Sequence, residues 1–127
     1  MPHFIIECSK NITQKVSSKK LLKAVYKEAE ASGLFAENDI KARLRYYKKY
    51  KLGRHKKSFV HVFGYIMEGR STEQKQALSR SIVEKLTALA PFSSFISMNI
   101  MDFEKATYSN KSLIDPSNEG GDRYHIL

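Results

Sequence analysis

The 127-residue chain has a single cysteine, Cys8, and no long hydrophobic run. One cysteine excludes an intrachain disulfide and a cysteine-based zinc cluster. No apolar stretch reaches the ~18 residues that a membrane-spanning helix needs, and the first ten residues lack the basic start and cleavage site of a signal peptide. A hydrophobic share of 42% excludes a fully disordered chain. We therefore expect one soluble, cytoplasmic domain over residues 1–127.

Acidic residues are missing from one long segment. Residues 41–57 contain nine lysines and arginines and no acid, whereas the other 13 basic residues are balanced by 13 acidic ones. This segment therefore carries the whole formal net charge of +9. Such a field attracts anions, which could be nucleic acid, an acidic surface or a small di-acid.

Hydrophobic periodicity divides most of the chain into two similar parts, residues 2–50 and 59–105. Short, nearly continuous apolar runs predict buried strands, and apolar residues at helical spacing predict the helix between each pair of strands. In the first part we expect a strand over 3–8, a helix over 17–32 and a strand over 40–50. In the second part we expect a strand over 59–67, a helix over 72–88 and a strand over 95–103.

The ends of the second helix have specific signals. Ser71 and Gln74 have the spacing of a capping box, in which each side chain satisfies an open backbone N–H of the other residue. Pro91 is well placed to close the helix.

Two tandem β-α-β units predict an α/β (α+β) fold, in which a four-stranded sheet has both helices on one face. The other face would be left uncovered, so we expect self-association through it. The polar segment over about 108–127 is expected to form a tail or a short edge strand without a core of its own.

Two motifs resemble a known enzyme family. The opening Met1–Ser9 (MPHFIIECS) resembles the start of 5-carboxymethyl-2-hydroxymuconate delta-isomerases. Glu68–Lys75 (EGRSTEQK) resembles a corner of the wider tautomerase superfamily, well known from 4-oxalocrotonate tautomerase. The similarity covers roughly residues 2–105. It implies the tautomerase fold, a homotrimer, no cofactor and no metal, and an isomerase of aromatic catabolism, in homoprotocatechuate degradation.

The resemblance also implies that Pro2 is the catalytic base. Once Met1 is removed, Pro2 has a secondary amine at the chain terminus, where the unperturbed pKa is ~7.7–8. Burial beside cations lowers such a pKa, which leaves a free base near neutral pH. The family's reaction is a proton shift, as enol–keto exchange or double-bond migration, on an unsaturated 2-hydroxymuconate-type dicarboxylate. Cations near the substrate would stabilise the dienolate intermediate.

Three basic residues are candidates for binding the substrate carboxylates. Arg70 matches a family arginine that grips substrate, and its alternative is a solvent-exposed charge at a helix start. A second family arginine falls on Lys41, and lysine keeps the charge but loses the bidentate fork. Arg43 points to the same side of an ideal strand and could substitute for it. Either of these two could instead be a solvated strand edge.

Two other functions remain open. One is a promiscuous tautomerase of other keto acids, such as phenylenolpyruvate-like compounds. The other is a non-catalytic, tautomerase-fold binding protein that uses the basic segment 41–57. Three tyrosines interleave with lysine and arginine there, as in surfaces that stack on nucleic-acid bases. We favour a small-molecule dicarboxylate over nucleic acid, because no known nucleic-acid-binding motif is present.

Overall fold

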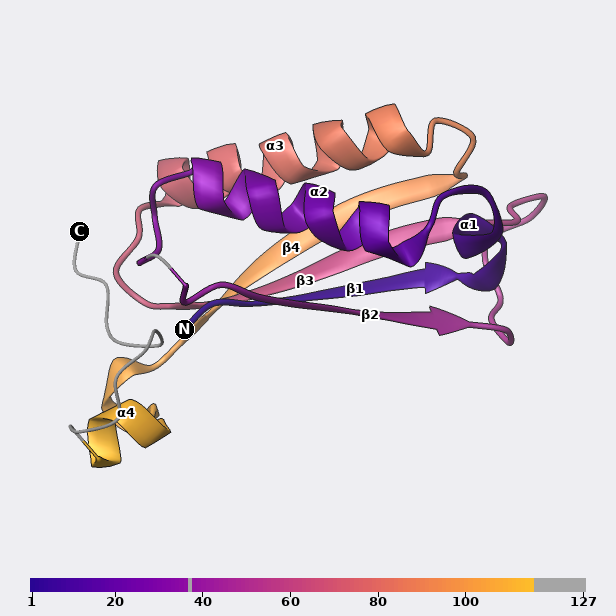
Figure 1. Ribbon diagram of the computed structural model, residues 1–127. Coiled ribbons are helices and arrows are strands. Elements are labelled where there is room, and N and C mark those ends of the chain that lie inside the picture. The colour runs from indigo at the N-terminus through magenta and orange to yellow at the C-terminus, as the bar shows by residue number, and fades with distance from the viewer. Residues whose placement is uncertain (37, 116–127) are drawn as a thin grey trace.

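The computed structural model describes residues 1–36 and 38–115 (Figure 1). The elements in chain order are β1 (His3–Ser9), α1 (Lys10–Lys15), α2 (Ser18–Ala31), β2 (Lys41–Tyr47), β3 (Phe59–Met67), α3 (Thr72–Leu89), β4 (Phe95–Phe103), the 3₁₀ helix η1 (Lys105–Thr107) and α4 (Lys111–Ile114). All four predicted strands and both predicted long helices are present. None of the helices in this part of the chain has the length and apolar content of a membrane span.

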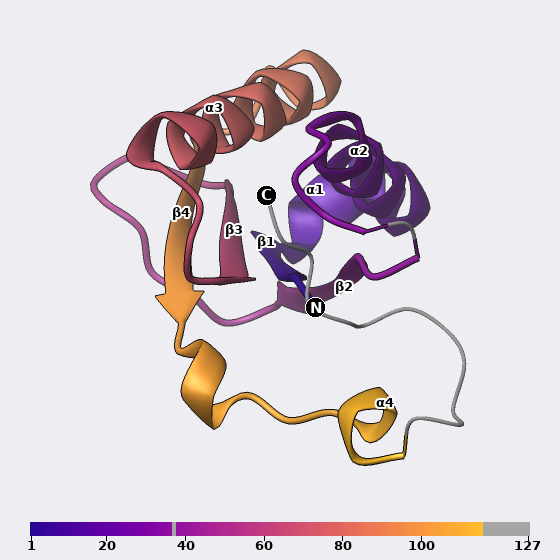
Figure 2. The same ribbon diagram turned by 90° about the vertical axis from the view of Figure 1, so that its left-hand side faces the viewer.

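The four strands form one sheet in the order β2-β1-β3-β4. Strand β1 runs parallel to β2, and β3 runs parallel to β4, while the two central strands β1 and β3 are antiparallel. Helices α2 and α3 lie side by side on the same face of the sheet (Figures 1 and 2). The prediction of two β-α-β units with both helices on one face is confirmed.

The core lies between the sheet and these two helices. Alternate residues of β1 point into it, and Phe4, Ile6 and Cys8 are fully buried. The helices contribute their apolar stripes, which are Leu21, Val25 and Ala29 from α2 and Leu78, Ile82 and Leu86 from α3. Fully burying an aliphatic side chain of this size stabilises the fold by ~1.5–3 kcal/mol relative to leaving it exposed. These stripes therefore fix which side of each helix faces the sheet.

Several boundaries differ from the expectations. Helix α1 was not predicted, and the strand expected over 40–50 ends at Tyr47, where the chain leaves the sheet. The capping box is confirmed, since Ser71 Oγ accepts from the Gln74 N–H at 3.1 Å and Gln74 Oε1 accepts from the Ser71 N–H at 2.9 Å. In the tail, residues 109–115 contain the short helix α4 and no edge strand. Residues 116–127 lie outside the described part.

Gly69 provides a test of the corner between β3 and α3. Its φ of +116° lies where residues with a Cβ are strained, although a Cβ there would meet nothing within 4 Å. Gly69→Ala should therefore lower the free energy of unfolding by ~1–3 kcal/mol in urea denaturation. Gly53→Ala is the matched control, because Gly53 lacks a positive φ and its Cβ would meet only Lys56 Cγ at 3.8 Å. Equal effects of the two substitutions would contradict this geometry.

Cys8 provides a test of the buried face of β1. Burial raises the pKa of its thiol to about 11, so the thiolate that reacts with alkylating agents is scarce at pH 8. Iodoacetamide should modify the folded chain at least ~100-fold more slowly than the urea-unfolded chain, whose thiol has a pKa of ~8.5. Intact-mass spectrometry over time measures both rates. Similar rates in the two states would show that β1 is not enclosed.

Candidate active site

Pro2, Lys41 and Arg70 all lie at one end of the sheet. Strands β1 and β2 begin there, directly after Pro2 and at Lys41, whereas β3 ends there at Met67, three residues before Arg70. The antiparallel register, which pairs His3 with Tyr65, produces this arrangement. The chain start and the corner after β3 meet at the same end in Figure 1. Residues far apart in sequence are thus neighbours at this end.

Met1 and Pro2 are both buried at this end. The Pro2 carbonyl accepts a hydrogen bond from the Lys41 N–H at 3.1 Å, which joins the start of β1 to the start of β2. Met1 has no exposed surface. Its ammonium donates to the Asp39 carbonyl at 2.9 Å, and its Sδ accepts from the Met67 N–H at 3.2 Å. Met1 therefore fills a space inside the protein next to the Pro2 nitrogen.

Arg70 is a buried cation, with only 6% of its surface exposed. Its Nη1 donates to the Met67 carbonyl at 3.3 Å and its Nη2 to the Leu34 carbonyl at 2.7 Å. The guanidinium also lies 5.3 Å from the centre of the Phe35 ring. Burial lowers the pKa of Arg70, and the charge of Asp102 acts in the opposite direction. The alternative of a charge in solvent is therefore wrong, since carbonyls from two segments hold the side chain in place.

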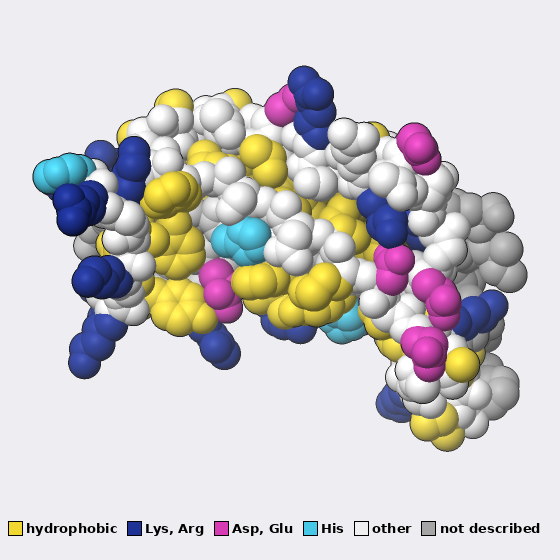
Figure 3. Space-filling view, turned by 180° about the vertical axis from the view of Figure 1, so that it is seen from behind, with side chains coloured by type: hydrophobic (Ala, Val, Ile, Leu, Met, Phe, Trp, Pro, Cys, Tyr) yellow, Lys and Arg dark blue, Asp and Glu magenta, His cyan; other side chains and the backbone are white. Residues whose placement is uncertain are grey.

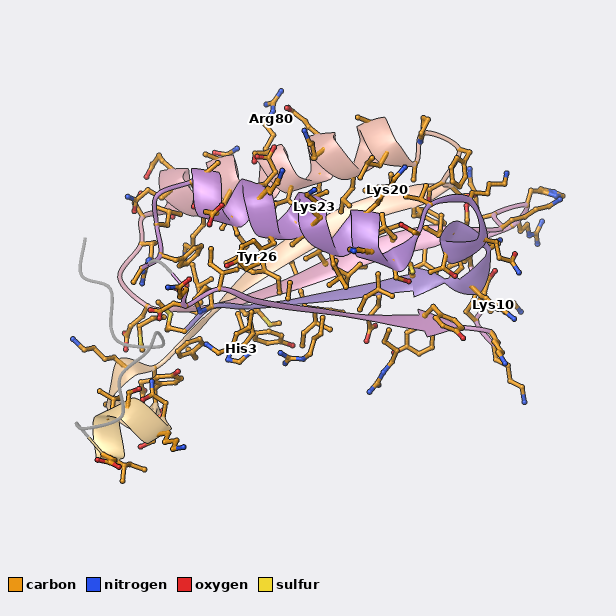
Figure 4. The ribbon with its side chains drawn as sticks, in the orientation of Figure 1. His3, Lys10, Lys20, Lys23, Tyr26 and Arg80 are labelled. Carbon is orange, nitrogen blue, oxygen red and sulfur yellow. The ribbon has the colours of Figure 1, made fainter. Side chains whose placement is uncertain are left out.

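Lys41 contacts the same backbone group as the chain terminus. Its Nζ donates to the Asp39 carbonyl at 2.9 Å, and the Met1 ammonium donates to that same oxygen. Arg43 lies two residue pairs further along the sheet and is exposed. Its Nη1 is 3.1 Å from His3 Nδ1, on the side of the sheet away from the helices, where Figure 4 labels His3. Lys41 thus stands closer to the Met1 position than Arg43 does.

Asp39 is the residue at this end that the sequence did not single out. It is fully buried, and its carbonyl oxygen accepts from two ammonium groups. The preceding residue, Asn38, has a φ of 67°, a conformation that asparagine tolerates better than most residues. An Asn-Asp pair between a helix and a strand indicates a turn. Nothing in the side-chain pattern could have shown that the Asp39 carbonyl faces the chain start.

The described residues lack the cluster of ligands that a metal site requires. Over residues 1–36 and 38–115, no group of three or more histidine, cysteine, aspartate or glutamate side chains is placed to hold a metal ion. The charged groups at the Pro2 end include the cations Lys41 and Arg70, and also the fully buried Asp39 and, acting on Arg70, Asp102. The two cations could hold an anionic ligand, since a guanidinium binds carboxylates and phosphates through paired hydrogen bonds.

Comparison with known proteins identifies the family. The family model described as 5-carboxymethyl-2-hydroxymuconate isomerase matches residues 2–115. The 5-carboxymethyl-2-hydroxymuconate Delta-isomerase of Escherichia coli is 33% identical over 86 residues, which cover 66% of this chain and 68% of that protein.

Solved structures show the same fold. A 5-carboxymethyl-2-hydroxymuconate isomerase from Deinococcus radiodurans R1 has a TM-score of 0.77 at 24% identity, covering 87% of this chain and 88% of that one. A fused 4-oxalocrotonate tautomerase (4-OT), described as a symmetric trimer, has a TM-score of 0.73 at 18% identity, covering 86% and 91%. The expected tautomerase fold is confirmed. The chain belongs to the 5-carboxymethyl-2-hydroxymuconate isomerase family and is an isomerase.

Proposed function

We propose that the enzyme shifts a proton on an unsaturated 2-hydroxymuconate-type dicarboxylate, with the Pro2 amine as its base once Met1 has been removed. The observation that supports this most directly is the buried position of Met1 between Lys41 and Arg70. The backbone of one residue links Met1 to each cation. On the Lys41 side the Asp39 carbonyl accepts from both, and on the Arg70 side the Met67 N–H donates to Met1 while the Met67 carbonyl accepts from Arg70. Excision of Met1 would leave the Pro2 nitrogen facing that space.

The chemistry follows from the state of the nitrogen. With Met1 attached, the Pro2 nitrogen is a tertiary amide and cannot accept a proton. As a terminal secondary amine it would have a pKa of ~7.7–8 in water. In the proposal, burial and the cations Lys41 and Arg70 lower that pKa further, and they outweigh the buried Asp39, which acts in the opposite direction. The free amine takes a proton from the substrate and forms an N–H bond, which leaves a dienolate. The proton comes from the enol hydroxyl in ketonisation, or from a carbon in double-bond migration, and it then passes to another carbon of the dienolate. The substrate is isomerised with no net oxidation or reduction, and the base is regenerated.

The two cations have different roles in this proposal. Arg70 is held by the Leu34 and Met67 carbonyls, so its charge is fixed before the substrate arrives and needs no reorganisation during the reaction. Lys41 is a point charge on a flexible stem. Lys41 would bind the carboxylate of the substrate that Arg70 does not bind. Arg43 would assist it from the face of the sheet that the helices leave uncovered. A fixed and a flexible cation would together orient an extended di-acid.

We also propose that the chain assembles as a homotrimer through the uncovered face of the sheet. That face includes Ile5, Phe63, Tyr65 and Met101, and Met101 is 36% exposed. Figure 3 shows hydrophobic side chains gathered over the middle of one side of the molecule. Burying such side chains against another copy is favourable. Two structures with this fold are described as symmetric trimers of fused 4-OT.

Pro2 and Arg70 can be tested in one ultraviolet assay of 2-hydroxymuconate ketonisation. Arg70→Ala should lower kcat/KM by ~100-fold or more, since it removes a preorganised charge. Pro2→Ala should lower kcat by at least ~10-fold, because a flexible primary amine replaces a fixed secondary one. Arg80→Ala is the matched control: Arg80 is exposed on α3, and its Nε forms an ion pair with Glu84 Oε1 at 2.9 Å. It should retain wild-type kinetics.

The intact mass of each assayed protein must also be measured, because it shows whether Met1 is present. The proposal requires the active protein to lack Met1. Full activity in a protein that retains Met1, or equal rates for wild type, Pro2→Ala and Arg70→Ala, would exclude the Pro2 mechanism.

A substitution at Lys41 tests whether the preferred substrate is a dicarboxylate or a simpler keto acid. Lys41→Arg restores the bidentate fork, so it should raise kcat/KM for 2-hydroxymuconate by several-fold and leave that for phenylenolpyruvate nearly unchanged. Steady-state kinetics with both substrates measures the ratio. If wild type strongly prefers phenylenolpyruvate and Lys41→Arg alters neither value, the keto-acid alternative is the better account.

A further inference from the structure

The end of the molecule opposite Pro2 is strongly basic. This end is formed by α1, the connection between β2 and β3, and the loop after α3. Each of them lies in a stretch of sequence without aspartate or glutamate, and these stretches are residues 8–27, 40–67 and 85–101. Residues 48–57 of the connection are mostly exposed. In Figure 3 lysine and arginine side chains gather at this end, on the left of the view. The proposed Pro2 chemistry lies at the other end of the sheet and makes no use of these charges.

A hollow of about 270 Å³ lies within this basic end. Its walls include Lys15 from α1, His55 and Lys57 from the connection, and Phe92 from the loop after α3. Phe92 is 42% exposed, and Lys15 Nζ lies 4.7 Å from the centre of its ring. Pockets for drug-sized ligands are ~300–1,000 Å³, so this hollow suits one small planar or anionic group rather than a large ligand.

The wall at Lys57 is held by hydrogen bonds to α1, to the loop after α3 and within the connection itself. The Lys57 carbonyl accepts from Asn11 Nδ2 at 2.9 Å and from the Tyr50 hydroxyl at 2.9 Å. The Lys57 N–H donates to Ser94 Oγ at 3.2 Å. These bonds fix the backbone from which the Lys57 side chain extends. The backbone of the connection is therefore anchored at Lys57, where it borders the hollow.

We propose that this end binds single-stranded nucleic acid, without strong sequence preference. Phosphates would be held by Lys15, Lys57 and the neighbouring lysines of the connection, and a base would stack on the partly exposed Phe92 ring. An aromatic ring bordered by cations is the arrangement that single-strand-binding proteins use. The hollow and its ring favour this partner over a flat anionic membrane, which needs charge alone. This proposal does not depend on the isomerase mechanism.

Fluorescence anisotropy of the full chain tests the proposal. The probe is a labelled oligothymidylate of about twelve nucleotides, within the ~4–16 nucleotides of known single-strand sites. Its matched control is an abasic strand with the same number of phosphates. The wild-type protein should bind oligothymidylate more tightly than the abasic strand, and its affinity should fall steeply between ~50 and ~200 mM salt.

Three variants separate charge from stacking. Lys15→Glu with Lys57→Glu should weaken binding to both strands by at least ~10-fold. Lys20→Glu with Lys23→Glu makes the same change in charge on exposed α2 residues, labelled in Figure 4, and should weaken binding by less than ~3-fold. Phe92→Ala should weaken oligothymidylate binding by ~5-fold or more and leave abasic binding unchanged.

Other results of these binding experiments would contradict the proposal, each in a different way. No binding to either strand at ~50 mM salt would overturn the proposal, as would equal losses from the two double variants. If the abasic strand binds as well as oligothymidylate and Phe92→Ala changes nothing, the surface is a general anion attractor and the proposed stacking is wrong. Binding to phosphatidylserine vesicles without binding to oligothymidylate would identify a membrane surface instead.

Discussion

The antiparallel pairing of β1 with β3 is the constraint on which the site depends. Within each half of the chain the strands are parallel, so both strands of a half begin at the same end of the sheet. Because the two halves run in opposite directions, the strand starts of the first half meet the strand ends of the second. This is why Met1 contacts Met67, although 66 positions separate them. A slip of one residue in this register would turn the buried side chains of β1 to the uncovered face.

The two ends of the sheet hold positive charge in different ways. At the Pro2 end, Arg70 is enclosed by carbonyls and an aromatic ring, and a charge in such low-dielectric surroundings acts strongly on a nearby anion. At the opposite end the lysines are exposed and hydrated, so each acts weakly and several must act together. The first arrangement suits one small substrate held in one orientation. The second suits a long polyanion.

Most of the fold could be predicted from the sequence, because its strands and long helices have strong apolar periodicity. Helix α1 could not, since only Ile12 of its six residues is buried and no helical stripe exists. The end of β2 at Tyr47 could not be predicted either, because the sequence continues beyond it with tyrosines and lysines and without a break in pattern. At the candidate site, Pro2 and Arg70 were proposed from motifs that resemble a family. Asp39 was missed because its contacts are made by a backbone carbonyl, which has no signature in the sequence.

The central claim is that the Pro2 nitrogen is a free amine of lowered pKa in the active protein. An NMR pH titration of the protein, labelled with ¹⁵N at proline, measures both properties directly. Our account predicts a terminal-amine resonance that titrates below the ~7.7–8 of an unperturbed chain terminus. An amide resonance that does not titrate, or an amine that titrates well above that range, would contradict it.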